Sequence, residues 1–421
     1  MKRTRGIIII FFILSIYPVQ GSAEEVLSWK DCIREAQKNH PDLISAQEQV
    51  NKSVADREVT KSGLFPQVTA DLGATTTKSS TKSKTTRTYD YGVSGSQLVF
   101  DGSKTEQELK AASEDIGAAK ETYRFTSSEV RLRLRSAFIN LLKAQELLKV
   151  TQDIYEIRRG NLLLISLRYE SGLEHKGAFL TAEANLAQAK LEIDRAKRDL
   201  EVAQSQLTKE LGRSEFRPMR IEGDFIVKLN NSKPDFAAIA SNNPSVKRLI
   251  FQKNSALYGV KSAYANFAPT ITAQSGAGRT SSRWPPQNSQ WDAGVSLSWP
   301  LFEGGLKSAQ LEQARSLYKQ YEADERSSRD TVVYALEEAW AGLQDAVESV
   351  GVEEMFLEAT EERSNIAEAQ YSLGLIQFDN WTIIEDDLVQ SKKSLLNARA
   401  NSLLAEANWI QAKGETLEYV D

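Results

Sequence analysis

The sequence predicts a mixed, mainly α-helical protein that is internally duplicated, with long coiled-coil-like helical hairpins and two β-hairpins. Three observations predict this fold class. Motifs of the first half recur in the same order roughly 200 residues later. Both halves contain long stretches of Ala, Leu, Glu, Lys and Gln with apolar residues at helical spacing. Each half also has two short segments in which apolar and polar residues alternate, as in strands with two different faces.

The repeat keeps its register over most of the chain. Pro41 and Pro244, each at the start of an expected helix, are 203 residues apart. Tyr169 of RYESGL and Tyr371 of QYSLGL are 202 residues apart. The change of one residue falls in the region where a hairpin loop is expected. Chance does not preserve such a register, so each half is predicted to be one copy of the same unit.

The amino terminus has the three parts of a secretory signal. MKRTRG is basic, IIIIFFILSI is apolar, and the small residues of VQGSAEE suit cleavage after Gly21 or Ala23. The apolar run is too short to cross a bilayer, and no later segment has the roughly 18 consecutive apolar residues of a transmembrane helix. We therefore expect residues 1–23 to be a signal peptide and the mature chain to lack a transmembrane helix.

Composition narrows the classes of function. A hydrophobic share of 41% with 26% charged residues is typical of a folded chain, and a net charge of −5 does not indicate nucleic-acid binding. The segment 75–88, TTTKSSTKSKTTRT, has four basic residues and no acidic one. It is interpreted as a solvated loop or, alternatively, as a loop that faces an anionic surface.

Few residues of the sequence are candidates for catalysis or metal binding. Cys32 lies within a helical pattern and is interpreted as a small helix-face residue, because a lipid anchor would need a cysteine directly after the cleaved signal. His40 and His175 have no cluster of potential ligands nearby in the sequence. We therefore expect no catalytic residue, no bound metal and no cofactor.

The first repeat is expected to cover residues 24–212. Its first helix is interrupted at Pro41, because a proline costs no hydrogen bond at a helix start, and a second proline stops it. The segments VTADLGATTT and YDYGVSGSQLVF predict a β-hairpin at about 65–101. A helix from 103 to about 169, roughly 100 Å long, follows. Gly172 ends this helix as a C-cap, and another helix returns.

The second repeat, residues 236–421, has the same plan. TITAQSGAG and WDAGVSLSWPLF predict a β-hairpin at about 268–303, and Gly374 separates a long helix from a returning one. The returning helix of each half has small and apolar residues at alternating steps of three and four, which is typical of supercoiled helices. Residues 213–235 join the two repeats.

The strand pattern is clearest in QWDAGVSLSWPLFEGG, at 290–305. One face carries Trp291, Val295, Leu297 and Trp299, and the other carries small polar residues. This alternation is typical of outer-membrane barrel strands, whose lipid-facing band has aromatic residues at its edges. A soluble sandwich with the apolar face turned inward is the alternative. Four strands cannot close a barrel, whereas three copies would supply 12, so a homotrimer in outer-membrane lipid is predicted.

The ordered set of features resembles the TolC family of outer-membrane efflux proteins. The Tyr-x-x-Gly-Leu elements at 169–173 and 371–375 belong to this set, with the duplicated halves and the two kinds of hairpin. The resemblance covers the whole mature chain. It implies a trimer whose 12-stranded transmembrane β-barrel continues into a periplasmic α-barrel. It also implies an equatorial layer, of which residues 213–235 are the candidate part.

The resemblance further implies two functional regions at the periplasmic end. The tips, where a periplasmic adaptor docks, correspond to Gly172, Leu173, Gly374 and Leu375. The family's acidic gate residues would fall near Asn380 and Ile383, neither of which is acidic. The acids close by are therefore the gate candidates: Asp379, Glu385, Asp386 and Asp387. Alternatively, they are solvated residues at a helix start, where carboxylates are favoured.

These features predict a passive outer-membrane exit channel of a tripartite efflux system, extending into the periplasm. An adaptor would open it and an inner-membrane pump would supply the energy, so no enzymatic activity is expected. One alternative within this class is the outer-membrane component of a type I protein secretion system. A soluble periplasmic coiled-coil scaffold is an alternative of another class, but it does not explain the two alternating hairpins.

Overall fold

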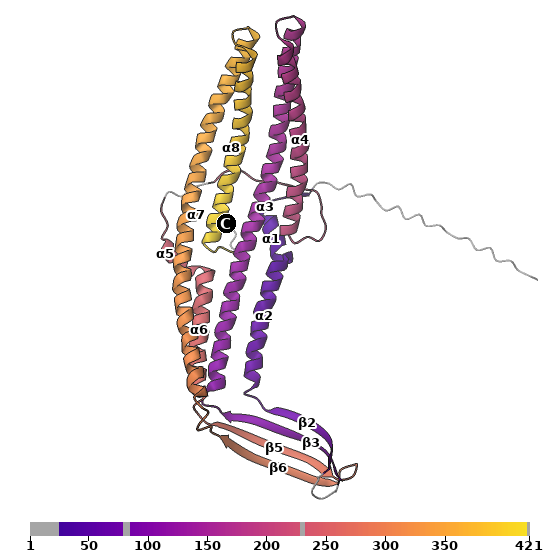
Figure 1. The fold of residues 1–421 in the computed structure, drawn as a ribbon, viewed down its shortest axis with the longest axis vertical. Helices are drawn as coiled ribbons and strands as arrows, with labels where there is room; N and C mark the ends of the chain where they lie inside the picture. The colour runs from indigo at the N-terminus through magenta and orange to yellow at the C-terminus, as the bar shows by residue number, and fades with distance from the viewer. Residues whose placement is uncertain (1–24, 79–84, 228–231, 419–421) are drawn as a thin grey trace, which may run out of the picture.

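The computed structural model describes residues 25–78, 85–227 and 232–418 of the chain. The expected signal peptide and residues 79–84 of the basic segment lie outside these ranges. The molecule is a long rod in which a β-sheet forms one end, helices form the shaft, and two helical turns form the opposite tip (Figure 1). No helix in the described ranges combines the length and apolar character required to cross a membrane.

The two halves contain matching elements. The described part of the first half contains β1 (Glu25–Leu27), α1 (Trp29–Asn39), α2 (Pro41–Ser62), β2 (Gln67–Lys78), β3 (Thr85–Phe100), α3 (Lys104–Glu170) and α4 (Lys176–Glu210). The remainder contains β4 (Met219–Ile221), α5 (Phe236–Asn242), α6 (Pro244–Ala265), β5 (Thr270–Ser281), β6 (Asn288–Ser298), α7 (Leu306–Ser372) and α8 (Phe378–Ala412). The long helices α3 and α7 have 67 residues each, and the returning helices α4 and α8 have 35 each. The predicted duplicated, mainly helical fold class is therefore confirmed.

The helix boundaries follow the residues from which they were predicted. Pro41 and Pro244 stand at the first turns of α2 and α6. Gly172 and Gly374, just beyond the ends of α3 and α7, have φ of +72° and +75°. The backbone N–H of the following leucine reaches back to the carbonyl of Arg168 in the first turn and of Gln370 in the second, both at 2.8 Å. These bonds form the Schellman type of helix end, which favours glycine because it needs φ above zero.

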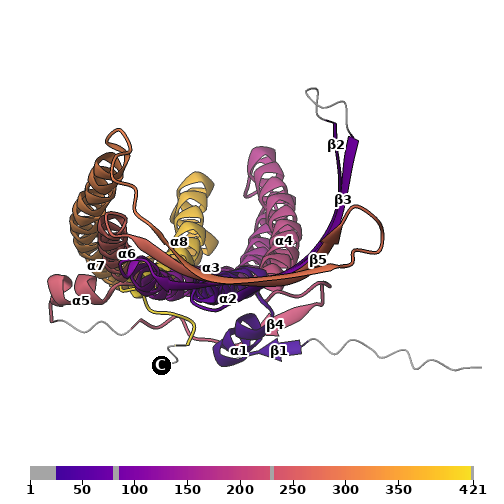
Figure 2. The same cartoon turned by 90° about the horizontal axis from the view of Figure 1, so that it is seen from below.

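The strands form one antiparallel sheet in the order β2-β3-β5-β6 within the described residues. Both hairpins are therefore adjacent, and β2 and β6 are the edges. Figure 2 shows that the sheet and the shaft helices follow one arc, with α1 and β1 on its convex side. The four strands of one copy therefore form an open, curved sheet and not a closed barrel.

The core of the shaft lies at mid-height. A cluster of buried apolar residues from α3, α4, β4 and α8 includes Leu134, Phe138, Leu207, Met219 and Leu403. Cys32 of α1 belongs to the same cluster, and burial raises the pKa of its thiol to about 12, as befits a small unreactive core residue. The parallel pair β1 and β4 was not predicted, and it brings part of segment 213–235 against α3.

The ends of the returning helices pack closely against the break between the first two helices. A Cβ on Gly212, after α4, would lie 2.5 Å from the carbonyl oxygen of Asn39. In the second half, a Cβ on Gly414 would lie 2.5 Å from Cδ of Pro244. Glycine at these two positions therefore permits both a positive φ and a close backbone approach.

We predict that Gly212→Ala destabilises the protein more than Gly172→Ala does. Both residues have positive φ, which costs a non-glycine residue about 1–2 kcal/mol, but a Cβ on Gly172 would meet nothing within 4 Å. The overlap at Gly212 adds about 1–3 kcal/mol. Thermal unfolding followed by circular dichroism measures the difference. Equal midpoints for the two variants would show that the approach to Asn39 contributes nothing.

Candidate functional site

The sheet has one apolar face, and the residues proposed as a membrane anchor lie on or beside it. Trp291 is 81% exposed and Val295 is 73% exposed, and strand pairing places Val295 opposite Ala273. Leu297 is exposed opposite Ile271. Trp299 differs from the expectation, because β6 ends at Ser298. Its indole N–H instead donates to the carbonyl of Phe267 at 3.1 Å, at the junction between sheet and helices.

The opposite face is polar and sterically crowded. Hydroxyl groups of Thr69 and Ser94 lie 2.8 Å apart across β2 and β3, and Gln274 donates to Ser296 at 3.1 Å across β5 and β6. A Cβ on Gly73 would lie 2.7 Å from the Asp90 carboxylate. Small residues therefore leave room for the carboxylates on this face. Such a face suits contact with water, while the other face suits contact with apolar surroundings.

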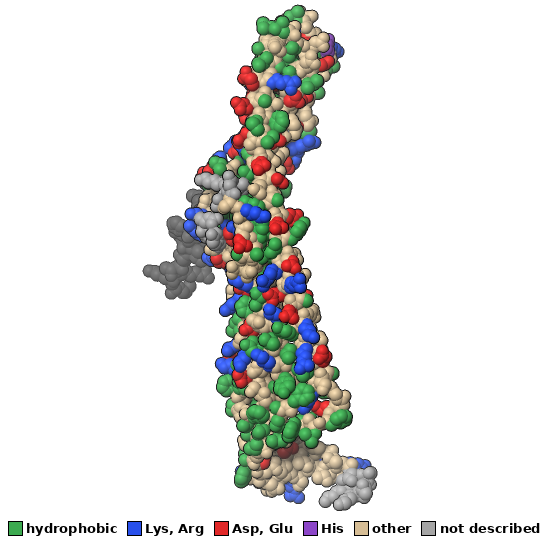
Figure 3. Space-filling model, turned by 90° about the vertical axis from the view of Figure 1, so that its left-hand side faces the viewer, with side chains coloured by type: hydrophobic (Ala, Val, Ile, Leu, Met, Phe, Trp, Pro, Cys, Tyr) green, Lys and Arg blue, Asp and Glu red, His purple; other side chains and the backbone are tan. Residues whose placement is uncertain are grey.

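Aromatic residues mark both ends of the sheet. Near the hairpin loops, the rings of Tyr89 and Trp284 meet edge to face with centroids 6.2 Å apart. At the helical end, Phe302 and Leu301 are almost fully exposed. Figure 3 shows hydrophobic side chains gathered on the shaft just above the sheet, whereas charged side chains are spread over the shaft farther up. The exposed apolar residues of the sheet, such as Val295 and Leu297, thus lie between an aromatic border near the loops and another at the helical end.

The helical tips expose the two candidate docking leucines. Leu173 is 67% exposed and Leu375 is 70% exposed. A Cβ on Gly172 would meet no atom within 4 Å, and one on Gly374 would meet only the end of the Arg168 side chain at 4.0 Å. The two turns are thus open to an approaching partner.

A polar and aromatic cluster joins the two tips. Arg168 of α3 donates to the carbonyls of Tyr371 and Ser372, at 3.2 and 3.3 Å, and so satisfies the end of α7. Tyr371 donates to Glu174 at 2.7 Å and stacks on Trp381 with centroids 4.3 Å apart. Burial, together with the hydrogen bond to Glu174, raises the pKa of Tyr371, so its phenol stays protonated. Sequence reasoning missed this cluster, although both tyrosines of the repeated motif pointed to the region.

The four gate candidates have different surroundings. Glu385 is only 3% exposed, and it accepts hydrogen bonds from Ser364 at 2.5 Å and Asn161 at 3.2 Å. Because its side chain is buried, Glu385 cannot line an open space in this conformation.

The other three candidates are exposed at the start of α8. Asp386 pairs with Arg158 of α3, and Asp387 pairs with Arg363 of α7 at 3.1 Å. Asp379 makes no ion pair with any residue in the described ranges. At the start of α8, therefore, Asp379 has no ion-pair partner in the described ranges, whereas Asp386 and Asp387 form ion pairs that join α8 to α3 and α7.

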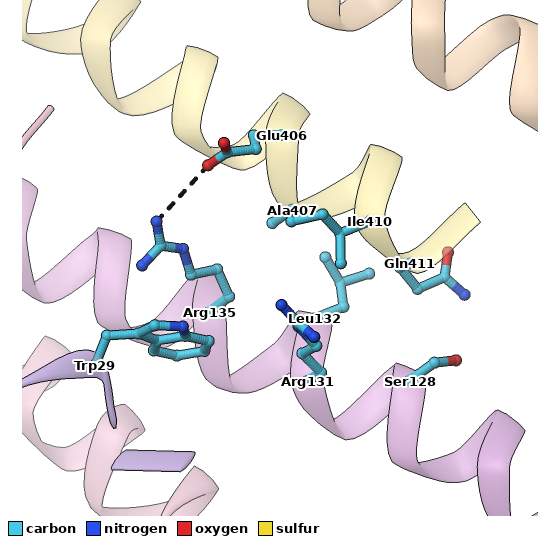
Figure 4. Close-up of a pocket in the computed structure, with 9 residues that line it drawn as sticks. All are labelled: Trp29, Ser128, Arg131, Leu132, Arg135, Glu406, Ala407, Ile410 and Gln411. Carbon is cyan, nitrogen blue, oxygen red and sulfur yellow. Dashed lines mark ion pairs between the residues drawn. The ribbon is translucent and has the colours of Figure 1, made fainter. Parts of the chain in front are cut away.

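The mid-shaft contains a cavity of about 200 Å³ between α3, α8 and Trp29. Figure 4 shows Arg135 pointing toward Glu406 across this cavity, and the ion pair measures 3.7 Å. The Arg135 guanidinium also lies 4.9 Å from the centre of the Trp29 ring. Burial lowers the pKa of Arg135, although Glu406 opposes this effect. These contacts tie the two halves together at the level of the core.

Comparison with known proteins identifies relatives over nearly the whole chain. A family described as "Outer membrane efflux protein" matches residues 32–213 and 237–415. The outer membrane efflux protein BepC of Brucella suis biovar 1 is 22% identical over 406 residues, which span 94% of this chain and 84% of BepC. The outer membrane protein TolC of Escherichia coli K12 is 24% identical over 400 residues, which span 87% of this chain and 79% of TolC.

A solved structure has the same fold. The crystal structure of CusC superposes with a TM-score of 0.83 at 18% identity, covering 95% of this chain and 96% of that one. The agreement extends over the sheet and the helical shaft together.

We predict that Glu385→Ala destabilises the protein by about 1–3 kcal/mol, because Asn161 and Ser364 would keep buried donors without an acceptor. Asp379→Ala is the matched control, and it should change stability by less than about 0.5 kcal/mol because its carboxylate is exposed. Thermal unfolding of the purified protein provides the measurement. A neutral Glu385→Ala variant would place Glu385 among the solvated acids instead.

Proposed function

Because the chain belongs to the outer membrane efflux protein family, we propose that it is the exit channel of a tripartite efflux system. The protein belongs in the outer membrane, as its relatives do. In the proposal, three copies form a continuous passive duct that performs no bond chemistry. A periplasmic adaptor opens the duct, and an inner-membrane pump supplies the energy.

The observation that carries the proposal is the two-faced sheet with free edges. Within the described residues, β2 and β6 each pair on one side only. Unpaired backbone groups are costly in lipid, so another copy must supply the neighbouring strand at each edge. Three copies give 12 strands, enough for a barrel with a water-filled interior. The apolar face would then meet lipid and the polar face would line the lumen.

The tips are proposed as the adaptor-docking surface. The exposed leucines Leu173 and Leu375 stand on turns whose glycines leave the backbone accessible. Exposed apolar side chains next to accessible backbone are typical of a surface that receives a partner. Both turns lie at the end of the rod remote from the sheet (Figure 1).

The periplasmic gate is proposed at the start of α8. Three-fold symmetry would turn an inward-facing Asp379 into a ring of three carboxylates. The pairs Arg158–Asp386 and Arg363–Asp387 hold α8 against α3 and α7, so they would keep this ring narrow. Residues 213–235 are proposed as part of the equatorial layer, since β4 packs on the convex side of the shaft (Figure 2).

The class of exported molecule depends on the pump. Genes for a drug or metal pump beside the gene of this chain would support efflux, whereas genes for a protein-exporting ATPase would support type I secretion. The soluble scaffold is not retained, because the family and its relatives belong to the outer membrane.

The faces of β6 provide the main test. We predict that Val295→Arg prevents stable membrane insertion, because a charge facing hydrocarbon costs about 2–4 kcal/mol per subunit. Ser296→Arg, one residue along and on the other face, should insert normally and change the conductance of the purified oligomer in a planar bilayer. If both variants inserted equally well, the assignment of the faces would be wrong, and an absence of any conductance would refute the channel itself.

The gate has a separate test. We predict that Asp379→Asn weakens the preference of the channel for cations, because a ring of three carboxylates at the entrance attracts them. Reversal potentials measured in a salt gradient report this preference. Asp379→Glu keeps the charge and should keep the selectivity. A channel whose selectivity is the same with Asn and with Glu would leave Asp379 as a solvated helix-start residue.

A further inference from the structure

The charged residues of the sheet are sorted by face. Side chains alternate along a strand, and residues paired across strands share a face, so the register assigns each residue to one side. The described residues of β2, β3, β5 and β6 include three cations, all on the apolar face: Lys78, Arg87 and Arg279. They also carry three acids, all on the polar face: Asp71, Asp90 and Asp292. A general solubilising surface would mix the two signs on each face.

On the apolar face, Arg87 and Arg279 each follow an aromatic side chain toward the loops. Across β3 and β5, Arg279 pairs with Tyr91, so it lies nearer the helices than Arg87 does. In the first hairpin, the pair Thr76–Arg87 follows the pair Ala74–Tyr89 toward the loop. Lys78 pairs with Thr85, two pairs farther toward the loop, and is the next residue of β2 on the same face.

The second hairpin repeats this order. The pair Arg279–Ser289 follows the pair Ala277–Trp291 toward the loop. In both hairpins, therefore, an aromatic side chain is followed by a cation at the end of the sheet remote from the helices (Figure 1).

All three cations are available to a partner. Each is exposed, and none forms an ion pair or side-chain hydrogen bond with another residue in the described ranges. The acids of the sheet cannot compensate them, because these carboxylates point to the opposite face. Long cationic side chains can extend along an apolar surface while their charged ends reach a polar layer.

We propose that Lys78, Arg87 and Arg279 bind the phosphate groups of anionic lipid in the external leaflet of the outer membrane. The proposal rests on the proposed function, in which the apolar face meets lipid. The aliphatic residues of this face then contact acyl chains, the aromatic border lies at the interface, and the cations lie at the level of the headgroups. A guanidinium offers two parallel hydrogen bonds to a phosphate, so Arg87 and Arg279 are the specific contacts.

The occupant is a lipid and not a soluble anion, because the cations share the face on which the apolar residues lie. A solute passing through the duct would meet the polar face, on which the charged strand residues in the described ranges are all acids. Two of the four basic residues of segment 75–88, Lys78 and Arg87, belong to this arrangement.

The test compares lipid binding by the full-length oligomer in mixed vesicles. Vesicles of phosphatidylcholine are supplemented with bisphosphorylated lipid A or with the same lipid after removal of its phosphates, and the lipid retained after mild extraction is measured by mass spectrometry. The test variant is Lys78→Gln/Arg87→Gln/Arg279→Gln. The matched control, Lys52→Gln/Arg159→Gln/Lys197→Gln, removes three exposed cations from the helices.

We expect the wild type and the control to retain phosphorylated lipid A preferentially, and the sheet variant to lose this preference by about fivefold or more. Competition by inorganic phosphate alone should be weak. The inference is overturned if the sheet variant keeps the preference, if the control loses it equally, or if dephosphorylated lipid binds as well. Conductance in phosphatidylcholine is recorded in parallel, so a conducting channel without lipid preference refutes this inference only, and a protein that neither inserts nor conducts refutes the channel.

Discussion

The backbone N–H and C=O groups along the outer sides of β2 and β6 have no strand partner within the described residues, and they border a face that carries the exposed apolar side chains of the sheet. In water the apolar face would be exposed, and in lipid the free edges would cost several kcal/mol for each unsatisfied group. In the proposed trimer, a neighbouring copy relieves the second cost and lipid relieves the first. The shaft helices follow the same arc as the sheet (Figure 2), so in the proposed trimer a closure that joins the sheets would also join the helices into a tube.

Because the chain is internally duplicated, one copy supplies two matching sets of the elements that the proposed closure needs. Each half supplies a β-hairpin and a helical hairpin, and glycines at the corner between them turn the chain, with φ of +69° at Gly102 and +60° at Gly304. At the first corner the fit is tight, because a Cβ on Gly102 would lie 2.5 Å from Cβ of Ala268 in the second half. The two hairpins are thereby held side by side with β3 against β5. In the proposed trimer, only the contacts between copies would remain to be made by assembly.

Local chemistry explains which features the sequence predicts. Pro41 and its counterpart fix their own φ, and Gly172 and its counterpart tolerate the positive φ of a helix end, so the helix boundaries could be predicted directly. Strands β1 and β4 have three residues each, too few to show a period, and their pairing joins distant segments. The sequence could not distinguish the acids after the second tip from one another, because their partners are also distant in the sequence. Arg158, the partner of Asp386, is 228 residues away in the sequence, and Asn161, one of the donors to Glu385, lies on α3. Only the folded structure therefore distinguishes the buried acid from the exposed one.

The kinds of contact along the shaft determine where the two halves can separate. At mid-height they share an apolar core that includes Leu134 and Leu403, and each fully buried side chain of this type contributes about 1.5–3 kcal/mol. At the tips a smaller apolar cluster joins the halves, with Ile165 of the first half and Trp381 of the second among its buried residues, and polar links such as Arg158–Asp386 lie beside it. Ion pairs that stay partly exposed contribute only about 0–1 kcal/mol, and water can replace their hydrogen bonds when they part. Separation of the halves at the tips would therefore expose this smaller cluster as well as break the polar links, whereas separation at mid-height would expose the larger core. The tips, where the gate and the docking turns are proposed, are thus the end at which fewer buried apolar residues join the halves.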